Sequence, residues 1–534
     1  MHKDLGDFQT PFELVQEILA CPELANKKWS RAIEPTCGQG NFIKGLLNLA
    51  TPPREIQAIE IQDRYLACVQ RTILPSLSTH IVIKQANIFD LNLHKDLQWK
   101  EQGPLLVIGN PPWVTNAALG VLGSNNLPVK KNVKRLGGIA AQTGESNFDI
   151  AEYIWLKLIK DLLPEQPTIA LLCKISVARN VLQFAIDTDL PIMQAFIRLI
   201  DAKKWFGAAV EACLFFVEIG QGKRWYEAPV YPDLSTLVPD STVGIVNKQL
   251  VANMQRYQYV ASTDGISPVM WRQGLKHDAA SVMELIYDSS GCLLNKFGET
   301  VTVEPQYLYP LFKSSDLFHG IDITAKRMVI VTQTHPGENT LLLAQKAPHL
   351  WKYLMQHQHI FAQRKSSIYE KQPPFAIFGI GEYSFAPYKV GISGFHKIPK
   401  FQAIGPVNGQ PVMLDDTCYF IPCYTAYETA CLTCLLNDPA CQNFIHSIIF
   451  LDAKRPITKK LLQRIDLVAL LKHIERQSFI ARARTVLEQL GASADDQQFT
   501  WSDAEHFLVE YFQDGYHSTS AKAKTDTMKQ LTWI

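Results

Sequence analysis

Strand-like apolar runs alternate with segments of helical spacing through about the first 220 residues of the chain. Uninterrupted runs of about four to eight apolar residues are typical of strands buried on both faces of a sheet. Strands are predicted over residues 31–34, 55–59, 81–84, 105–108, 168–172 and 212–217. Helices are predicted over 42–49 and 150–162, and the alternation predicts a doubly wound, mostly parallel α/β domain.

The pattern changes after Gly220, where shorter segments rich in proline, tyrosine and polar residues replace the strand–helix alternation. At 534 residues with 47% hydrophobic residues, the chain is long enough for two or more domains. We therefore expect two domains, residues 1–221 and 222–534, with α+β structure in the second.

The strand predicted at 105–108 leads into Gly109 and then into the tetrapeptide Asn110-Pro111-Pro112-Trp113. A residue before proline is held extended and proline lacks a backbone N–H, so the Asn110 amide oxygen and nearby carbonyl groups are presented as acceptors. Two such acceptors would bind the hydrogens of a conjugated amine and direct its lone pair toward a methyl donor. Trp113 would supply a face for a planar ring. An ordinary proline turn is the alternative interpretation.

Two glycines, Gly38 and Gly40, follow the strand predicted at 31–34 and would let the backbone turn sharply and approach a ligand. Glu60 ends the next predicted strand, twenty residues after Gly40. A carboxylate at this point accepts hydrogen bonds from ribose hydroxyls in doubly wound nucleotide sites. The spacing therefore predicts a cofactor that contains a nucleoside.

The segment before residue 14 carries the signals of a helix start. Thr10 would cap the helix, Pro11 suits its first position, and Glu13 would complete a capping box. The N-terminus of this helix could also face an anion, and an ordinary capped helix is the alternative.

Together, these pieces resemble the S-adenosylmethionine domain of DNA adenine-N6 methyltransferases of restriction-modification systems, in the group whose cofactor motifs precede the catalytic motif. A target-recognition domain comes last in that group. The resemblance implies a class I methyltransferase sheet with S-adenosylmethionine as its cofactor, and a C-terminal target-recognition domain. It places Thr10 and Pro11 near the methionine end, Glu34, Cys37, Gly38 and Gly40 along the methionine and sugar, and Glu60 at the ribose.

The same resemblance assigns the cofactor adenine to residues 87–90, after the strand predicted at 81–84. The family usually has Asp where Asn87 stands, and that Asp contacts the adenine amine. The carbonyl of Asn87 or the carboxylate of Asp90 would make this contact here, and the sequence leaves the two open.

Catalysis is assigned by resemblance to Asn110, Pro111, Pro112 and Trp113. Phe206 stands where the family has an aromatic ring on the second face of a target base flipped out of the duplex, and a core aromatic near a hairpin end is its alternative. Residues 124–138, rich in Gly and Asn, carry the cations Lys130, Lys131, Lys134 and Arg135. This loop could close over DNA phosphates, and a solvated charged loop is the alternative.

The chain has 52 Lys and Arg against 51 Asp and Glu, so any basic surface must be local. In the second domain, residues 307–316, 364–369, 385–390 and 397–401 interleave aromatics with cations, a composition typical of phosphate clamps and base-edge readers. A further basic cluster comprises Lys454, Arg455, Lys459, Lys460 and Arg464. Residues 309–316 and 452–456 resemble C-terminal recognition domains of restriction-modification methyltransferases, so we expect double-stranded DNA as the partner.

Eleven scattered cysteines favour reduced, mostly buried thiols over a disulfide framework. Five of them crowd one region and make a structural zinc an alternative there: Cys418, Cys423, Cys431, Cys434 and Cys441. Residues 427–436 nevertheless read as a helix with two of these cysteines on a buried face, so we expect no metal. The first 19 residues lack the apolar core of a secretory signal and no run of 18 apolar residues occurs, so we expect a cytoplasmic protein with no membrane partner.

The sequence therefore predicts a site-specific DNA methyltransferase acting on N6 of a flipped adenine, as the modification arm of a restriction-modification or phage-defence system. We expect any cognate restriction endonuclease to be encoded separately. Cytosine-N4 methylation is an alternative, although those enzymes more often have Ser at the position of Asn110. Glutamine-N5 methylation of a protein is another, although it needs no long C-terminal reader. A non-catalytic DNA-binding specificity module is the third, and the intact motifs at 38–40 and 110–113 count against it.

Overall fold

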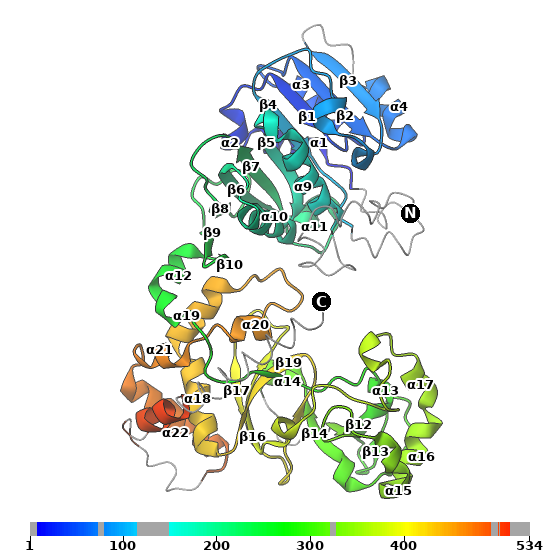
Figure 1. The fold of residues 1–534 in the computed structure, drawn as a ribbon, viewed down its shortest axis with the longest axis vertical. Helices are drawn as coiled ribbons and strands as arrows, with labels where there is room; N and C mark the ends of the chain where they lie inside the picture. The colour runs from blue at the N-terminus through cyan, green and yellow to red at the C-terminus, as the bar shows by residue number, and fades with distance from the viewer. Residues whose placement is uncertain are drawn as a thin grey trace. The chain divides into compact units, whose positions relative to one another are not determined.

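The structure is a computed structural model that describes residues 8–72, 79–114, 149–320, 327–492, 500, 502 and 504–512. The chain divides into two compact units, Met1–Gln255 and Arg256–Ile534 (Figure 1). The boundary thus lies after Gln255 and not near residue 222, because three short strands after residue 222 extend the sheet of the first unit. The assignment of catalysis to the first unit and DNA recognition to the second stays a prediction.

A ten-stranded sheet in the order β10-β9-β8-β6-β7-β5-β4-β1-β2-β3 forms the centre of the first unit. Its strands are β1 (Arg31–Glu34), β2 (Glu55–Glu60), β3 (His80–Gln85), β4 (Leu105–Gly109), β5 (Thr168–Lys174), β6 (Ile192–Ile200), β7 (Ala212–Ile219), β8 (Ala228–Tyr231), β9 (Ser241–Val246) and β10 (Gln249–Val251). Strands β1 to β5 are mutually parallel, and β7 lies antiparallel between β5 and β6. This is the class I methyltransferase sheet, and the predicted fold class is confirmed.

All six predicted strands are present, and β1, β2 and β4 are buried along their whole length. Three strands that were not predicted, β8, β9 and β10, follow 212–217 in the chain and extend the sheet. Strand β6 was not predicted, since Gln194 and Arg198 interrupt its apolar positions.

The helices of the first unit are α1 (Phe12–Leu19), α2 (Pro22–Ala25), α3 (Asn41–Leu47), α4 (Asp63–Thr72), α5 (Leu93–Asp96), α9 (Ile150–Leu162), α10 (Ile175–Asp187) and α11 (Ala202–Phe206). Helix α12 (Met254–Val260) spans the boundary. Figure 1 shows α9 and α10 together over one face of the sheet, and α1 packs against α3.

The predicted capping box at the start of α1 is wrong. Pro11 is itself the residue that precedes the helix, with ψ at 145°, and no side chain caps the first turn. Because Pro11 is extended, Thr10 lies too early in the chain to reach the first helical N–H groups. Its main-chain carbonyl instead accepts a hydrogen bond from Asn41 Nδ2 at 2.8 Å, which ties the start of α1 to the start of α3.

The second unit has the α+β structure expected for it. One sheet has the order β13-β12-β15-β14-β18 and the other β11-β19-β16-β17. The strands are β11 (Arg272–Gln273), β12 (Glu284–Tyr287), β13 (Leu293–Leu294), β14 (Leu308–Phe312), β15 (Arg327–Ile330), β16 (Tyr388–Ser393), β17 (Phe401–Ile404), β18 (Met413–Leu414) and β19 (Cys418–Cys423).

The helices of this unit are α13 (Ala280–Met283), α14 (Ser314–His319), α15 (Leu343–Lys346), α16 (Pro348–Gln356), α17 (Gln358–Ala362), α18 (Ala426–Leu436), α19 (Pro439–Ile448), α20 (Lys459–Leu462), α21 (Leu467–Leu471) and α22 (Arg476–Gln489). Helix α18 is buried along most of its length and packs against β16, β17 and α22. One apolar core lies around β12, β14, β15 and α16, and a smaller one includes Leu317, Ile404 and Phe420.

Candidate functional site

A pocket opens at the carboxyl ends of β1, β2, β3 and β4, where ligands bind in open α/β sheets. The segment before α1 and the first turns of α9 complete its walls. The predicted site residues that line it are Thr10, Glu34, Cys37, Gly38, Glu60, Asn87, Asn110 and Pro112. Pro11, Gly40, Asp90, Pro111, Trp113 and Phe206 are not among its lining residues.

The glycine turn after β1 requires the conformational freedom of both glycines. Gly38 has φ of +48° and Gly40 has φ of +78°, in the left-handed region that other residues rarely adopt. A Cβ atom on Gly38 would lie 2.4 Å from Gln9 Oε1, so a side chain there would also displace Gln9. The turn therefore brings bare backbone to the wall of the pocket.

Glu60 holds this turn in place. One carboxylate oxygen, Oε2, accepts the Gly38 N–H at 2.8 Å, and the other accepts the N–H groups of Ile61 at 2.9 Å and Gln62 at 2.8 Å. The carboxylate thus links the end of β2 to the glycine turn while facing the pocket. A ribose contact made by Glu60 stays a prediction.

Glu34 presents a buried acceptor to the same pocket. Its Oε2 atom has no hydrogen-bond partner, and burial together with the nearby Glu60 charge raises the pKa of this carboxyl well above its usual value. A cationic ligand group would pair with it, so these residues fit the ammonium and sulfonium charges of S-adenosylmethionine. Burial also raises the pKa of the Cys37 thiol, which leaves Cys37 protonated and without nucleophilic character.

Asn87 and Asp90 are placed differently by the short 3-10 turn η2 (Ile88–Asp90) that follows β3. Asn87 lines the pocket, and its Oδ1 atom accepts the Phe89 N–H at 3.1 Å. Asp90 is exposed and does not line the pocket. The arrangement favours Asn87 for a contact with the cofactor adenine, which stays a prediction.

The Asn110 side chain is oriented by a partner that lies far away in the sequence. Its Nδ2 atom donates to the main-chain carbonyl of Phe8 at 3.0 Å, and its Oδ1 atom is buried without a hydrogen-bond partner. The hydrogen-bond network therefore assigns the amide so that the oxygen is the group left to accept. An unpaired buried acceptor carries a free-energy cost that a bound N–H donor would relieve.

Trp113 and Phe206 meet, as the resemblance implied, but not as parallel walls. Their ring centroids are 5.2 Å apart and their planes are inclined by 76°. Trp113 is 6% exposed and Phe206 9%, and neither lines the pocket, so the arrangement differs from the expected slot between two faces, and a contact of these rings with a flipped base stays a prediction. Trp113 Nε1 donates to the Leu172 carbonyl at 3.4 Å, and this bond orients the indole ring.

Phe8 completes this aromatic group and was missed by sequence reasoning. Its ring centroid lies 5.8 Å from that of Trp113 and 5.7 Å from that of Phe206. Its position two residues before Thr10 was the available signal, because the segment before α1 was already expected near the cofactor.

The basic loop at 124–138 lies outside the described residues, so its predicted DNA contact stays a prediction.

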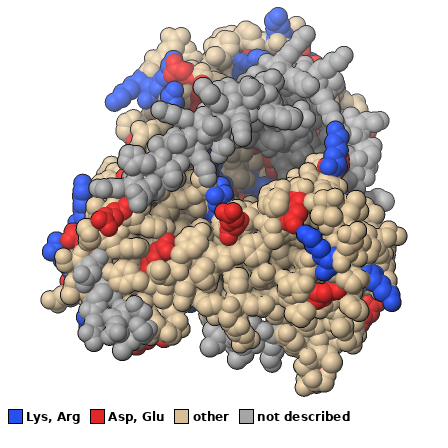
Figure 2. Space-filling view, turned by 60° about the horizontal axis from the view of Figure 1, so that its bottom comes forward, with Lys and Arg blue, Asp and Glu red and all other residues tan. Residues whose placement is uncertain are grey.

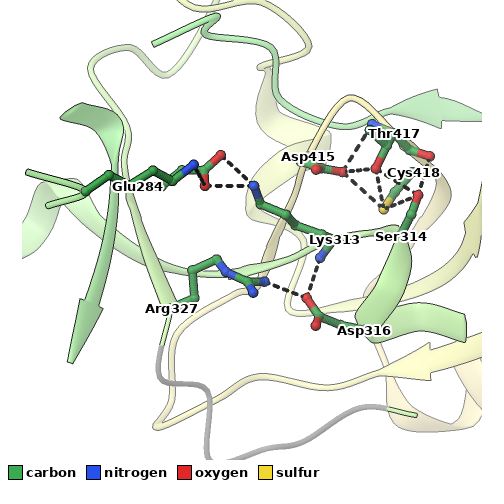
Figure 3. Close-up of polar contacts among 9 residues, drawn as sticks. Glu284, Lys313, Ser314, Asp316, Arg327, Asp415, Thr417 and Cys418 are labelled. Atoms are coloured by element: carbon green, nitrogen blue, oxygen red, sulfur yellow. Dashed lines mark hydrogen bonds and ion pairs between the residues drawn. The ribbon is translucent and has the colours of Figure 1, made fainter. Parts of the chain in front are cut away.

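Several cations of the second unit already have carboxylate partners. Lys313 Nζ lies 2.7 Å from both carboxylate oxygens of Glu284, and its main-chain N–H donates to Asp316 (Figure 3). Arg464 pairs with Asp264 at 2.7 Å. These two predicted phosphate contacts are therefore engaged within the unit, because each carboxylate neutralises the charge that a phosphate would need.

Other predicted cations remain at the surface. Lys454 and Lys460 are exposed, and Arg455 lies partly exposed beside Asp416. On the part of the face in Figure 2 that the described residues form, charged side chains of both signs are scattered over a mainly neutral surface. Nucleic-acid contacts on that face would rely on individually placed side chains and not on a broad basic field.

All eleven cysteines are present as thiols and not as disulfides, and nine of them are buried. The helix predicted at 427–436 is confirmed as α18, with Cys431 and Cys434 buried. Within the described ranges, no group of three or more His, Cys, Asp or Glu side chains could hold a metal ion. In the same ranges, no helix is both long and apolar enough to cross a membrane.

The chain is similar in sequence to a curated protein of comparable length. The type II methyltransferase M.NspV from Nostoc sp. (strain ATCC 29411 / PCC 7524) is 34% identical over 475 residues, which cover 88% of this chain and 98% of that protein. No protein-family model matches the sequence.

Among solved structures, the type IIL restriction-modification enzyme MmeI in complex with DNA is 12% identical, with a TM-score of 0.49, and the match covers 94% of this chain and 74% of MmeI. A protein from Listeria monocytogenes, assigned to the class I S-adenosylmethionine-dependent methyltransferases, is 11% identical with a TM-score of 0.28. That match covers 42% of this chain and 64% of the other.

Proposed function

The chain belongs to the type II methyltransferases, which use S-adenosylmethionine, and within this family we propose that it methylates the N6 amine of a specific adenine in double-stranded DNA. The proposed setting is the modification arm of a restriction-modification or phage-defence system, with any cognate endonuclease a separate protein. S-adenosylmethionine supplies an electrophilic methyl group when it occupies the pocket.

The observation that carries this proposal is the unpaired Oδ1 atom of Asn110 at the wall of the cofactor pocket. An exocyclic amine would donate one hydrogen to this atom and the other to a main-chain carbonyl of the turn after β4. Both bonds strengthen as positive charge develops on the nitrogen, so they stabilise the transition state more than the ground state. The described residues at this turn include no basic side chain. The proposed hydrogen bonds from the amine to Asn110 and to the main-chain carbonyl would activate the amine without a basic group.

The neighbouring aromatic rings support a ring-bearing substrate. Both rings are buried, with Trp113 6% and Phe206 9% exposed, and they pack on each other at 76°, so a base that stacks on Trp113 would have to displace part of this aromatic packing. The amine of a paired adenine lies inside the base stack, whereas Asn110 Oδ1 is buried. The base must therefore leave the duplex to reach this atom, at a cost of a few kcal/mol that stacking of about 1–3 kcal/mol offsets in part.

Cytosine-N4 and glutamine-N5 methylation present the same kind of amine to the same turn. Asn110 favours adenine, because cytosine-N4 enzymes resembling this family more often carry Ser there. A second unit of residues 256–534 favours a DNA substrate over a protein side chain, since a glutamine enzyme needs no reader of this size.

The test is incubation of the purified protein with methyl-tritiated S-adenosylmethionine and mixed DNA and protein substrates, followed by nucleoside analysis of the labelled DNA. Labelled N6-methyladenine that disappears in Asn110→Ala is the expected result. Label found in N4-methylcytosine or in protein would instead identify cytosine or a protein side chain as the substrate. No label in any macromolecule, with cofactor still bound, would favour a non-catalytic DNA-binding module.

A further inference from the structure

A hydrogen-bonded cluster on the second unit has features that the proposed methyl transfer does not use. It consists of Arg455, Asp416, Gln273 and Phe395, and we refer to it as the Arg455 cluster. Arg455 Nη1 donates to the Asp416 main-chain carbonyl and Nη2 to the Asp416 carboxylate, each at 3.1 Å. Gln273 Nε2 donates to the same carbonyl at 2.7 Å. Two separate segments of the chain, carrying Arg455 and Gln273, therefore converge on Asp416.

The Arg455 guanidinium is held in a fixed orientation at the surface. It lies 4.9 Å above the centre of the Phe395 ring, and the Arg455 side chain is 34% exposed. Its contacts with Asp416 use only some of its N–H groups, and the described part of the chain provides no partner for the others. The cluster thus presents a planar set of donors whose position is already determined before any ligand binds.

The loop that carries Asp416 is fixed by the polar contacts of its two neighbours, Asp415 and Thr417, shown in Figure 3. Asp415 Oδ1 accepts the Thr417 N–H at 3.1 Å and also the Thr417 hydroxyl. The Ser314 hydroxyl, at the start of α14, lies 2.8 Å from the Thr417 carbonyl oxygen. Lys313, the preceding residue, is anchored on Glu284. Both neighbours of Asp416 are therefore held by partly buried polar contacts, which limits the movement of Asp416, the partner of Arg455.

We propose that the Arg455 cluster reads a base pair in the major groove of the DNA target, with the Arg455 guanidinium donating to O6 and N7 of a guanine. This inference rests on the proposed function. Guanine offers two adjacent acceptors that match the guanidinium, and this pairing is the commonest specific contact in the major groove. The Gln273 amide, which is exposed, lies beside it and can contact the neighbouring base.

A phosphate is a poorer ligand for this cluster than a base edge. The Asp416 carboxylate is 27% exposed and lies beside the guanidinium, so it would repel a phosphate at the same place. The base edge is uncharged and brings no such repulsion. Lys454, the preceding residue, is exposed, and no hydrogen bond or ion pair involves it among the described residues, which makes it the better phosphate contact.

The test compares Arg455→Ala, Lys454→Ala and the matched control Arg482→Ala. Arg482 is equally exposed at 34% and pairs with Asp438 at 2.9 Å, but no aromatic ring lies under it in the described structure. The methylated sequence is first read from DNA labelled by the wild-type protein. Binding and methylation are then measured on that site and on duplexes with single base-pair changes.

We expect Arg455→Ala to lose discrimination at one G·C pair, on the order of 10- to 100-fold, with other positions unchanged. Lys454→Ala should weaken binding to all duplexes alike and reduce its salt dependence. Arg482→Ala should leave sequence preference intact. Arg455→Lys keeps the charge but not the planar fork, so it should lose the same discrimination, and it serves as the second variant if Arg455→Ala does not fold.

If Arg455→Ala weakened the binding of every duplex equally, Arg455 would be a phosphate contact, and the proposal would be overturned. Unchanged DNA binding with a lower Tm would make it a structural ion pair, which also overturns it. Failure of the wild-type protein to label any DNA would instead refute the proposed function, so the two failures are distinguishable.

Discussion

The main-chain carbonyl of Phe8 accepts a hydrogen bond from the side-chain Nδ2 of Asn110 at 3.0 Å, across 102 residues of sequence. This bond decides which end of the Asn110 amide faces the pocket. Because Nδ2 is occupied, Oδ1 is the atom available to a substrate amine. The segment before α1 thus contributes to the proposed chemistry by orienting Asn110.

Asn110→Ala is expected to reduce turnover on the order of 10²–10³-fold while cofactor binding remains close to that of the wild type. The reason is that Oδ1 acts on charge that develops during the reaction. Single-turnover methylation and calorimetric cofactor titration measure the two effects. Equal losses in both would contradict this role.

Glu60→Ala is expected to show the opposite division of effects. Glu60 accepts the N–H of Gly38 at 2.8 Å, so its removal releases the glycine turn as well as the predicted ribose contact. The dissociation constant for S-adenosylmethionine should rise, while turnover at saturating cofactor stays near wild type. Unchanged cofactor affinity of Glu60→Ala would contradict a contribution of Glu60 to cofactor binding.

Cofactor binding is expected to release a proton from Glu34. Burial raises the pKa of this carboxyl well above its ordinary value of 4.5, so the folded protein without cofactor loses stability as pH rises from that value toward the raised pKa. A bound cation favours the ionised form and lowers the pKa again, so affinity should increase with pH over the same range.

Calorimetric titration in two buffers of different ionisation enthalpy measures this proton. The apparent binding enthalpies should differ for the wild type and agree for Glu34→Gln. Glu34→Gln should also bind the cofactor more weakly, and its Tm without cofactor should fall less as pH rises. Identical enthalpies for the wild type in both buffers would refute the linkage.

A mismatch at the target adenine is expected to bind more tightly than the matched site, since less pairing is lost on extrusion. Trp113→Ala should weaken binding to both duplexes and reduce turnover, because the base loses its stacking face. Gel-shift titrations and methylation assays measure these effects. Equal affinities for the two duplexes, or normal methylation by Trp113→Ala, would argue against an extruded base at this position.

Lys313→Ala is expected to lower the free energy of unfolding by about 1–3 kcal/mol without altering the salt dependence of DNA binding. Glu284 is 7% exposed and would lose its two contacts of 2.7 Å to Lys313, although Lys296 remains 3.3 Å away. Urea unfolding and binding at several salt concentrations measure the two properties. A flatter salt dependence of DNA binding by Lys313→Ala would instead indicate that Lys313 contacts DNA.

The sequence by itself determined the elements whose signals are local. The apolar run at 105–108 predicted β4, Gly38 and Gly40 predicted the turn after β1, and Glu60 was correctly placed at the end of β2. Each depends on burial pattern or on backbone dihedrals of consecutive residues, which neighbouring residues impose directly. The alternation of these elements also predicted a doubly wound, mostly parallel sheet, because parallel strands require crossovers that leave helices between them.

Only the tertiary structure decided how distant side chains meet. The bond from Asn110 to Phe8, the 76° angle between Trp113 and Phe206, and the pairing of Lys313 with Glu284 join segments with no shared local pattern. A polar or aromatic side chain can satisfy its contacts with any suitable group that folding brings near it. The same residue types are therefore compatible with several partners until packing selects one, and that selection depends on the whole folded chain.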